Sequence, residues 1–156
     1  MPPPATIDFD HASDYADVAR RFEACIDRQF ALCLALESLA DSLPARMDTY
    51  EAIRLLEKLN ATLRQIHRFE ETMVFPVLMI SARDLRETLE RLRTEHLEDE
   101  DQAADIRDAL ETYVTHRGGA PDEIGYMLRG LFTAMRRHLA FDRDQILPQY
   151  RRSCGL

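Results

Sequence analysis

Residues 67–76 read HRFEETMVFP, and residues 138–148 read HLAFDRDQILP. Each stretch contains a histidine, an acidic residue four positions later and a proline soon after it. Apolar residues before each stretch recur every three or four positions, which is the spacing of an amphipathic helix. The chain therefore carries two similar helix ends, and its two halves look like related helix pairs.

Working outward from these stretches, apolar stripes with helical spacing predict four helices, and no strand-like alternation is found. The signals at the helix ends are Pro44, Asp48 as an N-cap, Pro76 as a stop or kink, Ser81 as an N-cap, Gly118–Gly119, Pro121 in a first turn, and Pro148 as a stop. The predicted helices run over about residues 13–43, 48–75, 81–117 and 121–147.

Short connections between these helices make neighbours antiparallel. The predicted fold class is therefore all-α, an up-down-up-down antiparallel four-helix bundle. We expect the bundle to occupy residues 13–150, after an N-terminal arm at 1–12 and before a C-terminal tail at 151–156.

Length and charge narrow the function classes. The 156 residues suggest one domain, and a net charge of −8 argues against a nucleic-acid partner. No run of about 20 apolar residues exists, so we expect no membrane span. The N-terminus lacks the pattern of a secretory signal, and the expected location is cytoplasmic.

Polar residues inside the apolar stripes need an explanation. His67 and Glu71 are four residues apart, as are His138 and Asp142, so each pair shares one helix face. The stripes turn both pairs toward the core, where a charge costs several kcal/mol unless it is paired or bound to a metal. Imidazoles and carboxylates together are typical ligands of a transition metal, so a buried metal site is predicted.

The positions of these residues along the bundle axis support the same site. The third and fourth helices turn near residue 117, and His96 and His138 each lie 21 residues from that turn. In the first helix pair, His67 is level with Glu23. Residues equidistant from the turn of an antiparallel pair lie at one level, so these side chains are expected at similar depths.

From about residue 15 to 150 the sequence resembles the hemerythrin-like (HHE cation-binding) proteins. Three pieces carry the resemblance: His67-x-x-x-Glu71 with Val74-Phe75-Pro76, then Glu95-His96, then His138-x-x-x-Asp142 with Ile146-Leu147-Pro148.

Members of that family are four-helix bundles with a non-haem di-iron centre. The resemblance implies two carboxylate-bridged irons, although another divalent metal could take their place. It also implies imidazole ligands at His67, His96 and His138, and bridging carboxylates at Glu71 and Asp142. Reversible binding or sensing of dioxygen, nitric oxide or iron is implied rather than enzymatic turnover.

The first helix departs from the family pattern, because it lacks the expected histidine. By depth the substitute is Glu23, by stripe position Gln29 is more central, and Asp27 is a third candidate. On the third helix Glu100 follows His96 by one turn, and it could supply another ligand.

Several acidic residues near the predicted ligands allow more than one interpretation. Glu70 is a second inward acid beside Glu71, and the acidic run at residues 98–101 is expected to be a solvated face. The competing hypothesis is a bundle without functional metal, acting as an interaction or regulatory domain. A homo-oligomer or a regulatory protein partner is compatible with either hypothesis.

Overall fold

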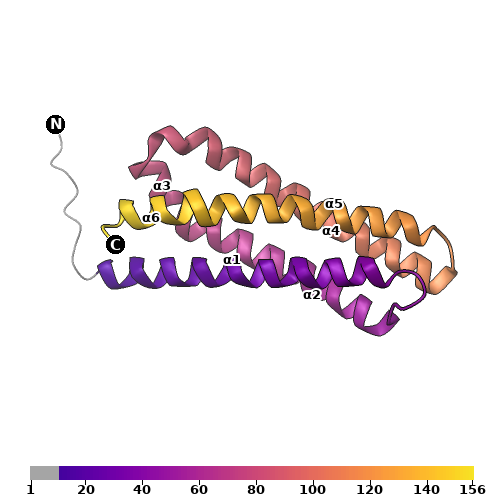
Figure 1. Ribbon diagram of the computed structural model, residues 1–156. Coiled ribbons are helices and arrows are strands. Elements are labelled where there is room, and N and C mark those ends of the chain that lie inside the picture. Colours follow the sequence, from indigo (N-terminus) through magenta and orange to yellow (C-terminus); the bar gives the residue numbers. More distant parts are fainter. Residues whose placement is uncertain (1–10) are drawn as a thin grey trace, which may run out of the picture.

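The computed structural model describes residues 11–156, which form four long helical rods joined by short turns (Figure 1). The first and third rods are single helices, whereas the second and fourth each consist of three consecutive elements. In chain order the elements are α1 (His11–Ser42), α2 (Thr49–Phe69), the π-helix η1 (Glu70–Val74), α3 (Phe75–Ser81), the 3₁₀ turn η2 (Arg83–Leu85), α4 (Arg86–His116), α5 (Pro121–Phe141), the π-helix η3 (Asp142–Ile146) and α6 (Leu147–Ser153).

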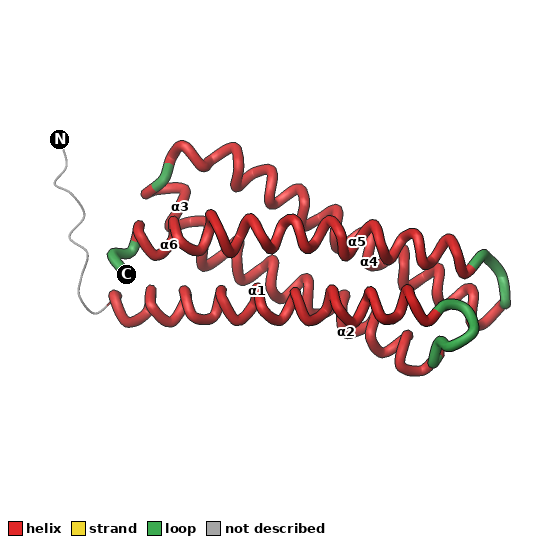
Figure 2. The backbone as a smooth tube through the Cα atoms, viewed as in Figure 1, coloured by secondary structure: helices red, strands yellow, loops and turns green. Residues whose placement is uncertain are grey.

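Each of the four rods packs against two neighbouring rods, which closes the bundle. Helix α1 packs against α2 and α5, and α4 packs against the same two helices from the other side of the bundle. Consecutive rods are antiparallel and loops occur only at the ends, as the tube in Figure 2 shows. The predicted all-α four-helix bundle is confirmed, and residues 11–156 contain no strand. The predicted arm falls largely on residues 1–10, which lie outside the described part.

Apolar side chains from all four rods fill the bundle interior. Phe22, Leu59, Leu92 and Leu128 are among the residues that are fully or almost fully buried. Burying a side chain of this size stabilises the fold by about 1.5–3 kcal/mol relative to leaving it in water. This core fixes the rods and thereby the inward positions of any polar residue in the same stripes.

The two prolines of the repeated stretches do not end their rods. The prediction that Pro148 closes the last helix is wrong, since α6 continues past it, and Pro76 likewise lies inside the second rod. Each proline occupies the first turn of a new helix, where its missing N–H has no partner to lose. Just before each proline the helix forms a wider π-turn. In these turns the Phe75 N–H donates to the Glu70 carbonyl, and the Leu147 N–H donates to the Asp142 carbonyl.

The predicted caps have different outcomes. Asp48 caps α2 as expected, since its carboxylate accepts the Glu51 N–H at 3.0 Å. The prediction for Ser81 is wrong: its hydroxyl donates to the Val77 carbonyl at 2.7 Å, and α4 begins only at Arg86, after η2.

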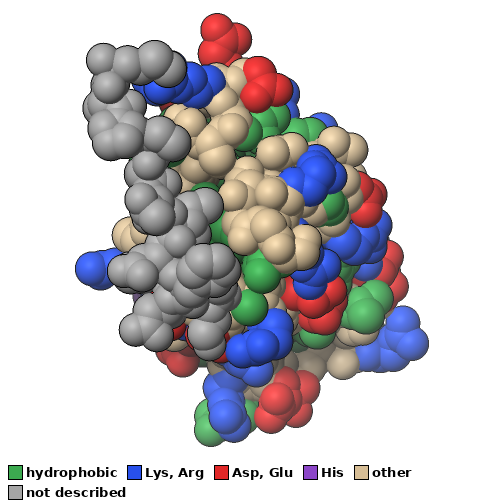
Figure 3. All heavy atoms as spheres, turned by 90° about the vertical axis from the view of Figure 1, so that its left-hand side faces the viewer, with side chains coloured by type: hydrophobic (Ala, Val, Ile, Leu, Met, Phe, Trp, Pro, Cys, Tyr) green, Lys and Arg blue, Asp and Glu red, His purple; other side chains and the backbone are tan. Residues whose placement is uncertain are grey.

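Basic and acidic side chains are interspersed on the end of the bundle that faces the viewer in Figure 3. Surface ion pairs of the bundle include Arg151 with Glu23, 2.9 Å apart. Within residues 11–156, none of the helices has the length and apolarity needed to cross a membrane.

Candidate metal centre

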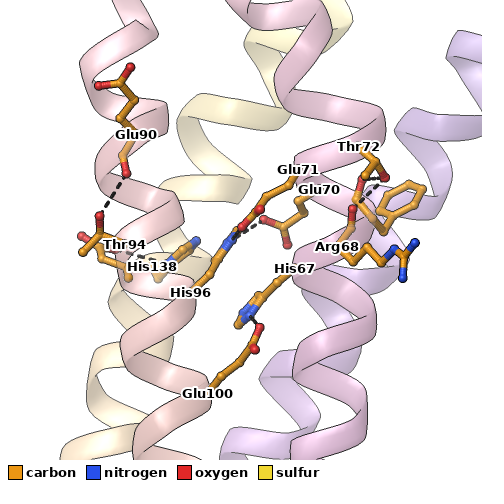
Figure 4. A network of polar contacts seen from close by, with 12 residues as sticks. His67, Arg68, Glu70, Glu71, Thr72, Glu90, Thr94, His96, Glu100 and His138 are labelled. Carbon is orange, nitrogen blue, oxygen red and sulfur yellow. Dashed lines mark hydrogen bonds and ion pairs between the residues drawn. The ribbon is translucent and has the colours of Figure 1, made fainter.

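Three rods bring three buried histidines together. His67 comes from α2, His96 from α4 and His138 from α5. The His67 and His96 rings are stacked with centroids 3.9 Å apart, and the His96 and His138 rings with centroids 5.0 Å apart. The level expected from the helix turns is therefore met, and the three imidazoles form one cluster in the bundle interior (Figure 4).

Two fully buried carboxylates adjoin this cluster. Glu70 and Asp142 are the first residues of η1 and η3, and neither is exposed to solvent. The Glu70 Oε2 atom lies 3.2 Å from His96 Nε2, and the Asp142 Oδ2 atom lies 3.2 Å from His138 Nε2. Both π-helices thus begin at a carboxylate that faces the histidines, and π-turns of this kind are frequent at functional sites.

The histidine Nε2 atoms that lie 3.2 Å from these carboxylates do not meet hydrogen-bond geometry. Among the described residues, neither oxygen of Glu70 or Asp142 has a hydrogen-bond partner, and His96 Nε2 has none either. Burial, reinforced by the negative charge of Asp142, raises the pKa of Glu70. Unpartnered buried carboxylates cost several kcal/mol, and a cation removes that cost.

The donor atoms are close enough for one ion to reach several of them. Single ligand atoms of Glu70, His96 and His138 all lie within 4.8 Å of one another. Two carboxylates with neutral imidazoles suit divalent iron, manganese or zinc. The residues present therefore fit a divalent transition metal.

A second set of carboxylates meets the other nitrogen of each ring. The Nδ1–carboxylate pairs are His67–Glu100 at 2.7 Å, His96–Glu71 at 2.8 Å and His138–Glu95 at 3.2 Å. These three glutamates are partly exposed, unlike Glu70 and Asp142. The centre thus has an inner layer around Nε2 atoms and an outer layer on Nδ1 atoms.

The three histidines differ in charge. Burial and the charges of His96 and His138 lower the pKa of His67 to about 2, so His67 is neutral. Burial also opposes the charged form of His138, but Asp142, Glu70 and then Asp99 outweigh it and raise the pKa to about 9. The pKa of His96 is likewise raised, because Glu70 and Glu71 outweigh burial. The raised pKa values of His96 and His138 thus come from the carboxylates around these two rings.

The structure places the site residues expected from the sequence in three locations. His67, His96, His138 and Asp142 lie in the inner layer. Glu71 and Glu100 lie in the outer layer, each against a histidine rather than beside the inner carboxylates.

Glu23 lies elsewhere, half-exposed and paired with Arg151. The distance from the helix turn predicts the position of Glu23 along the bundle, but not the direction of its side chain. At this position Phe22 and Ile26 occupy the core-facing side of α1. Of the other two candidates on α1, Gln29 is buried and Asp27 is exposed.

Three acidic residues have a larger part in the centre than the sequence predicted. Glu70 continues the apolar stripe of Ile66 and Val74, which was the available signal for its burial. Asp99 was assigned to a solvated run, yet it is buried, and burial raises its pKa to about 6. Glu95 had no role beyond its place next to His96.

A surface pocket of about 330 Å³ reaches the centre from outside. Its lining consists of Arg91, Leu92, Glu95, Arg137, His138 and Phe141. One buried imidazole, that of His138, therefore lines a pocket that opens to solvent.

Comparison with known proteins gives one family. The sequence model described as the hemerythrin HHE cation binding domain matches residues 19–150. No curated protein and no solved structure matches the chain. The matched range contains every histidine and carboxylate of the centre.

Proposed function

The chain belongs to the hemerythrin HHE cation-binding domain family, and on that premise we propose that it is a non-haem di-iron protein that binds or senses dioxygen, nitric oxide or iron itself. The observation that carries the proposal is the pair of buried, unpartnered carboxylates, Glu70 and Asp142, facing an imidazole cluster.

The proposed ligands are the inner-layer residues. His67, His96 and His138 would each offer a nitrogen, and Glu70 and Asp142 would offer the bridging oxygens, with Glu70 in the place that the family pattern gives to Glu71. The reason for preferring Glu70 is that it is fully buried and has no hydrogen bond, whereas Glu71 is hydrogen-bonded to His96 Nδ1 at 2.8 Å.

The donors are unequally distributed. His96 and His138 lie within reach of Glu70 oxygens, whereas His67 lies outside that compact group. Helix α1 contributes no histidine to the cluster within the described residues. We therefore expect one tighter iron position near His96 and His138 and a weaker one near His67.

Iron held by these residues would supply redox chemistry and bind a diatomic ligand. The chain's own residues control the surroundings. Phe75 stacks on His96 with ring centroids 5.8 Å apart, which keeps water from that side of the ring. The pocket that His138 lines opens to solvent.

Metal analysis of protein purified with iron supplied tests the proposal, together with absorption spectra before and after exposure to air. About two irons per chain and near-ultraviolet bands of a bridged centre are the expected result. Nitric oxide added to the reduced protein should give a new visible band.

The alternative is a metal-free bundle used for interaction or regulation. It is favoured by one observation: the outer glutamates already pair with all three histidines. A chain that binds no metal after anaerobic reconstitution would support this alternative and remove the iron proposal.

A further inference from the structure

We propose that Glu71, Glu95 and Glu100 are positioning residues, each of which holds one histidine of the centre by Nδ1 and leaves Nε2 for the metal. This inference rests on the proposed metal site, and it assigns the three glutamates a role different from ligation.

The geometry of the pairs is the first support. Each glutamate oxygen lies 2.7–3.2 Å from an Nδ1 atom. The contacts of His67 and His96 are hydrogen bonds, whereas the His138–Glu95 contact is an ion pair without hydrogen-bond geometry. At His96 and His138 the Nε2 atom of the same ring lies 3.2 Å from an inner carboxylate. The two nitrogens of an imidazole point away from each other, so an acid on Nδ1 is not beside an ion on Nε2.

The pairs also connect different rods. His67 of α2 meets Glu100 of α4, and in the opposite direction His96 of α4 meets Glu71 of η1. His138 of α5 meets Glu95 of α4. The reciprocal contacts between the second and third rods orient both rings and fix the spacing of the helices that carry them (Figure 4).

The two layers of acidic residues differ in the exposure of their side chains to solvent. The side chains of Glu71, Glu95 and Glu100 are 34%, 29% and 23% exposed, whereas those of Glu70 and Asp142 are 1% and 0% exposed. The outer acids thus border solvent on the Nδ1 side of the rings, whereas the inner acids are enclosed on the Nε2 side.

The expected chemical effect follows from the tautomer. A carboxylate that accepts the Nδ1 proton keeps the lone pair on Nε2 and makes that nitrogen a better ligand. Loss of such an outer partner typically weakens metal affinity about 10- to 100-fold. Glu95 also contacts Arg91 at 3.5 Å, which connects the His138 pair to the pocket at the surface.

The test uses the full chain with Co²⁺ as the probe. Alanine and glutamine variants are made at positions 71, 95 and 100, with Glu90→Ala and Glu90→Gln as controls, since Glu90 is an exposed acid on α4. Affinity is measured by competition with a chelator, and the coordination shell by the visible Co²⁺ spectrum.

If the glutamates position the rings, each alanine variant loses about 10- to 100-fold in affinity while the Co²⁺ spectrum keeps its shape. The glutamine variants, whose side chains still accept a hydrogen bond, keep most of the affinity of the unmodified chain. If a glutamate is instead a ligand, glutamine is as damaging as alanine and the spectrum shifts, which overturns the proposal for that residue.

A measurement on the metal-free chain separates this inference from the proposed function. Nitrogen-15 NMR should show slowly exchanging Nδ1 protons on His67 and His96, each lost in the matching alanine variant. Absence of these signals in the unmodified chain overturns the positioning role even if metal binds. A chain that binds no Co²⁺ overturns the proposed function, whatever the NMR signals show.

Discussion

The imidazole rings of His67 and His96 lie face to face, with centroids 3.9 Å apart and planes 8° from parallel. Two protonated rings at this separation would repel each other. Burial together with the charge of His96 lowers the pKa of His67 to about 2, so His67 is the neutral member of the pair. Its neutral ring offers an unprotonated nitrogen, whereas the carboxylates around His96 raise the pKa of that ring and favour its protonated form.

The first prediction concerns the number of bound ions. His67→Ala should leave one tightly bound ion per chain, because the compact donor group of Glu70, His96 and His138 remains. His138→Ala should lower the affinity of that tight position at least about 100-fold, since it removes a ligand. Elemental analysis and titration with Fe²⁺ under anaerobic conditions measure both. Equal losses in the two variants would contradict the unequal positions.

The second prediction concerns pH. The pKa of His138 is raised to about 9, so below pH 9 its Nε2 must lose a proton before it can bind metal. Each displaced proton makes the apparent affinity fall about tenfold per pH unit as the pH decreases. We expect weaker binding at pH 6 than at pH 8 by about 100-fold or more. Calorimetry in two buffers of different ionisation enthalpy should count at least one proton released at pH 7, and a pH-independent affinity would argue against it.

The third prediction concerns stability. Metal at 100 times its dissociation constant should stabilise the folded chain by about 2.7 kcal/mol, because only the folded state brings the ligands together. For a chain of this size that corresponds to a rise in melting temperature of about 5–10 °C. Thermal unfolding followed by circular dichroism measures the rise, and a chelator should reverse it. An Asp142→Asn variant should show a much smaller rise.

The fourth prediction concerns the first helix. Glu23→Ala should keep full metal loading, because Glu23 points outward and pairs with Arg151. An exposed pair of this kind contributes at most about 1 kcal/mol to stability. Metal content and melting temperature are compared with those of Glu70→Ala, which should lose its tight ion. Loss of metal in the Glu23 variant would place a ligand on α1 after all.

Much of this architecture could be predicted from the sequence because helical periodicity is a strong signal. The four helices, their antiparallel order and the convergence of His67, His96 and His138 follow from stripes and turn positions. These quantities depend on the sequence spacing alone, and a regular helix preserves them over its whole length.

The choice between Glu70 and Glu71 could not be made in the same way. A spacing of four residues from His67 favours Glu71 on a regular α-helix. The chain leaves that geometry at Glu70, where the wider π-turn begins, and the proline that follows is part of the same local structure. Glu23 shows a related limit, since depth along a rod does not determine which way a side chain points.

Each half of the chain carries a π-helix that begins at a buried acid, Glu70 in the first half and Asp142 in the second. The two halves differ, because one half places its carboxylate three residues after the histidine and the other places a shorter acid four residues after it. Two ions bound between these halves would therefore meet different surroundings. Substitutions at equivalent places in the two halves should therefore act on different steps, one on loading of the centre and the other on the reactivity of the loaded centre.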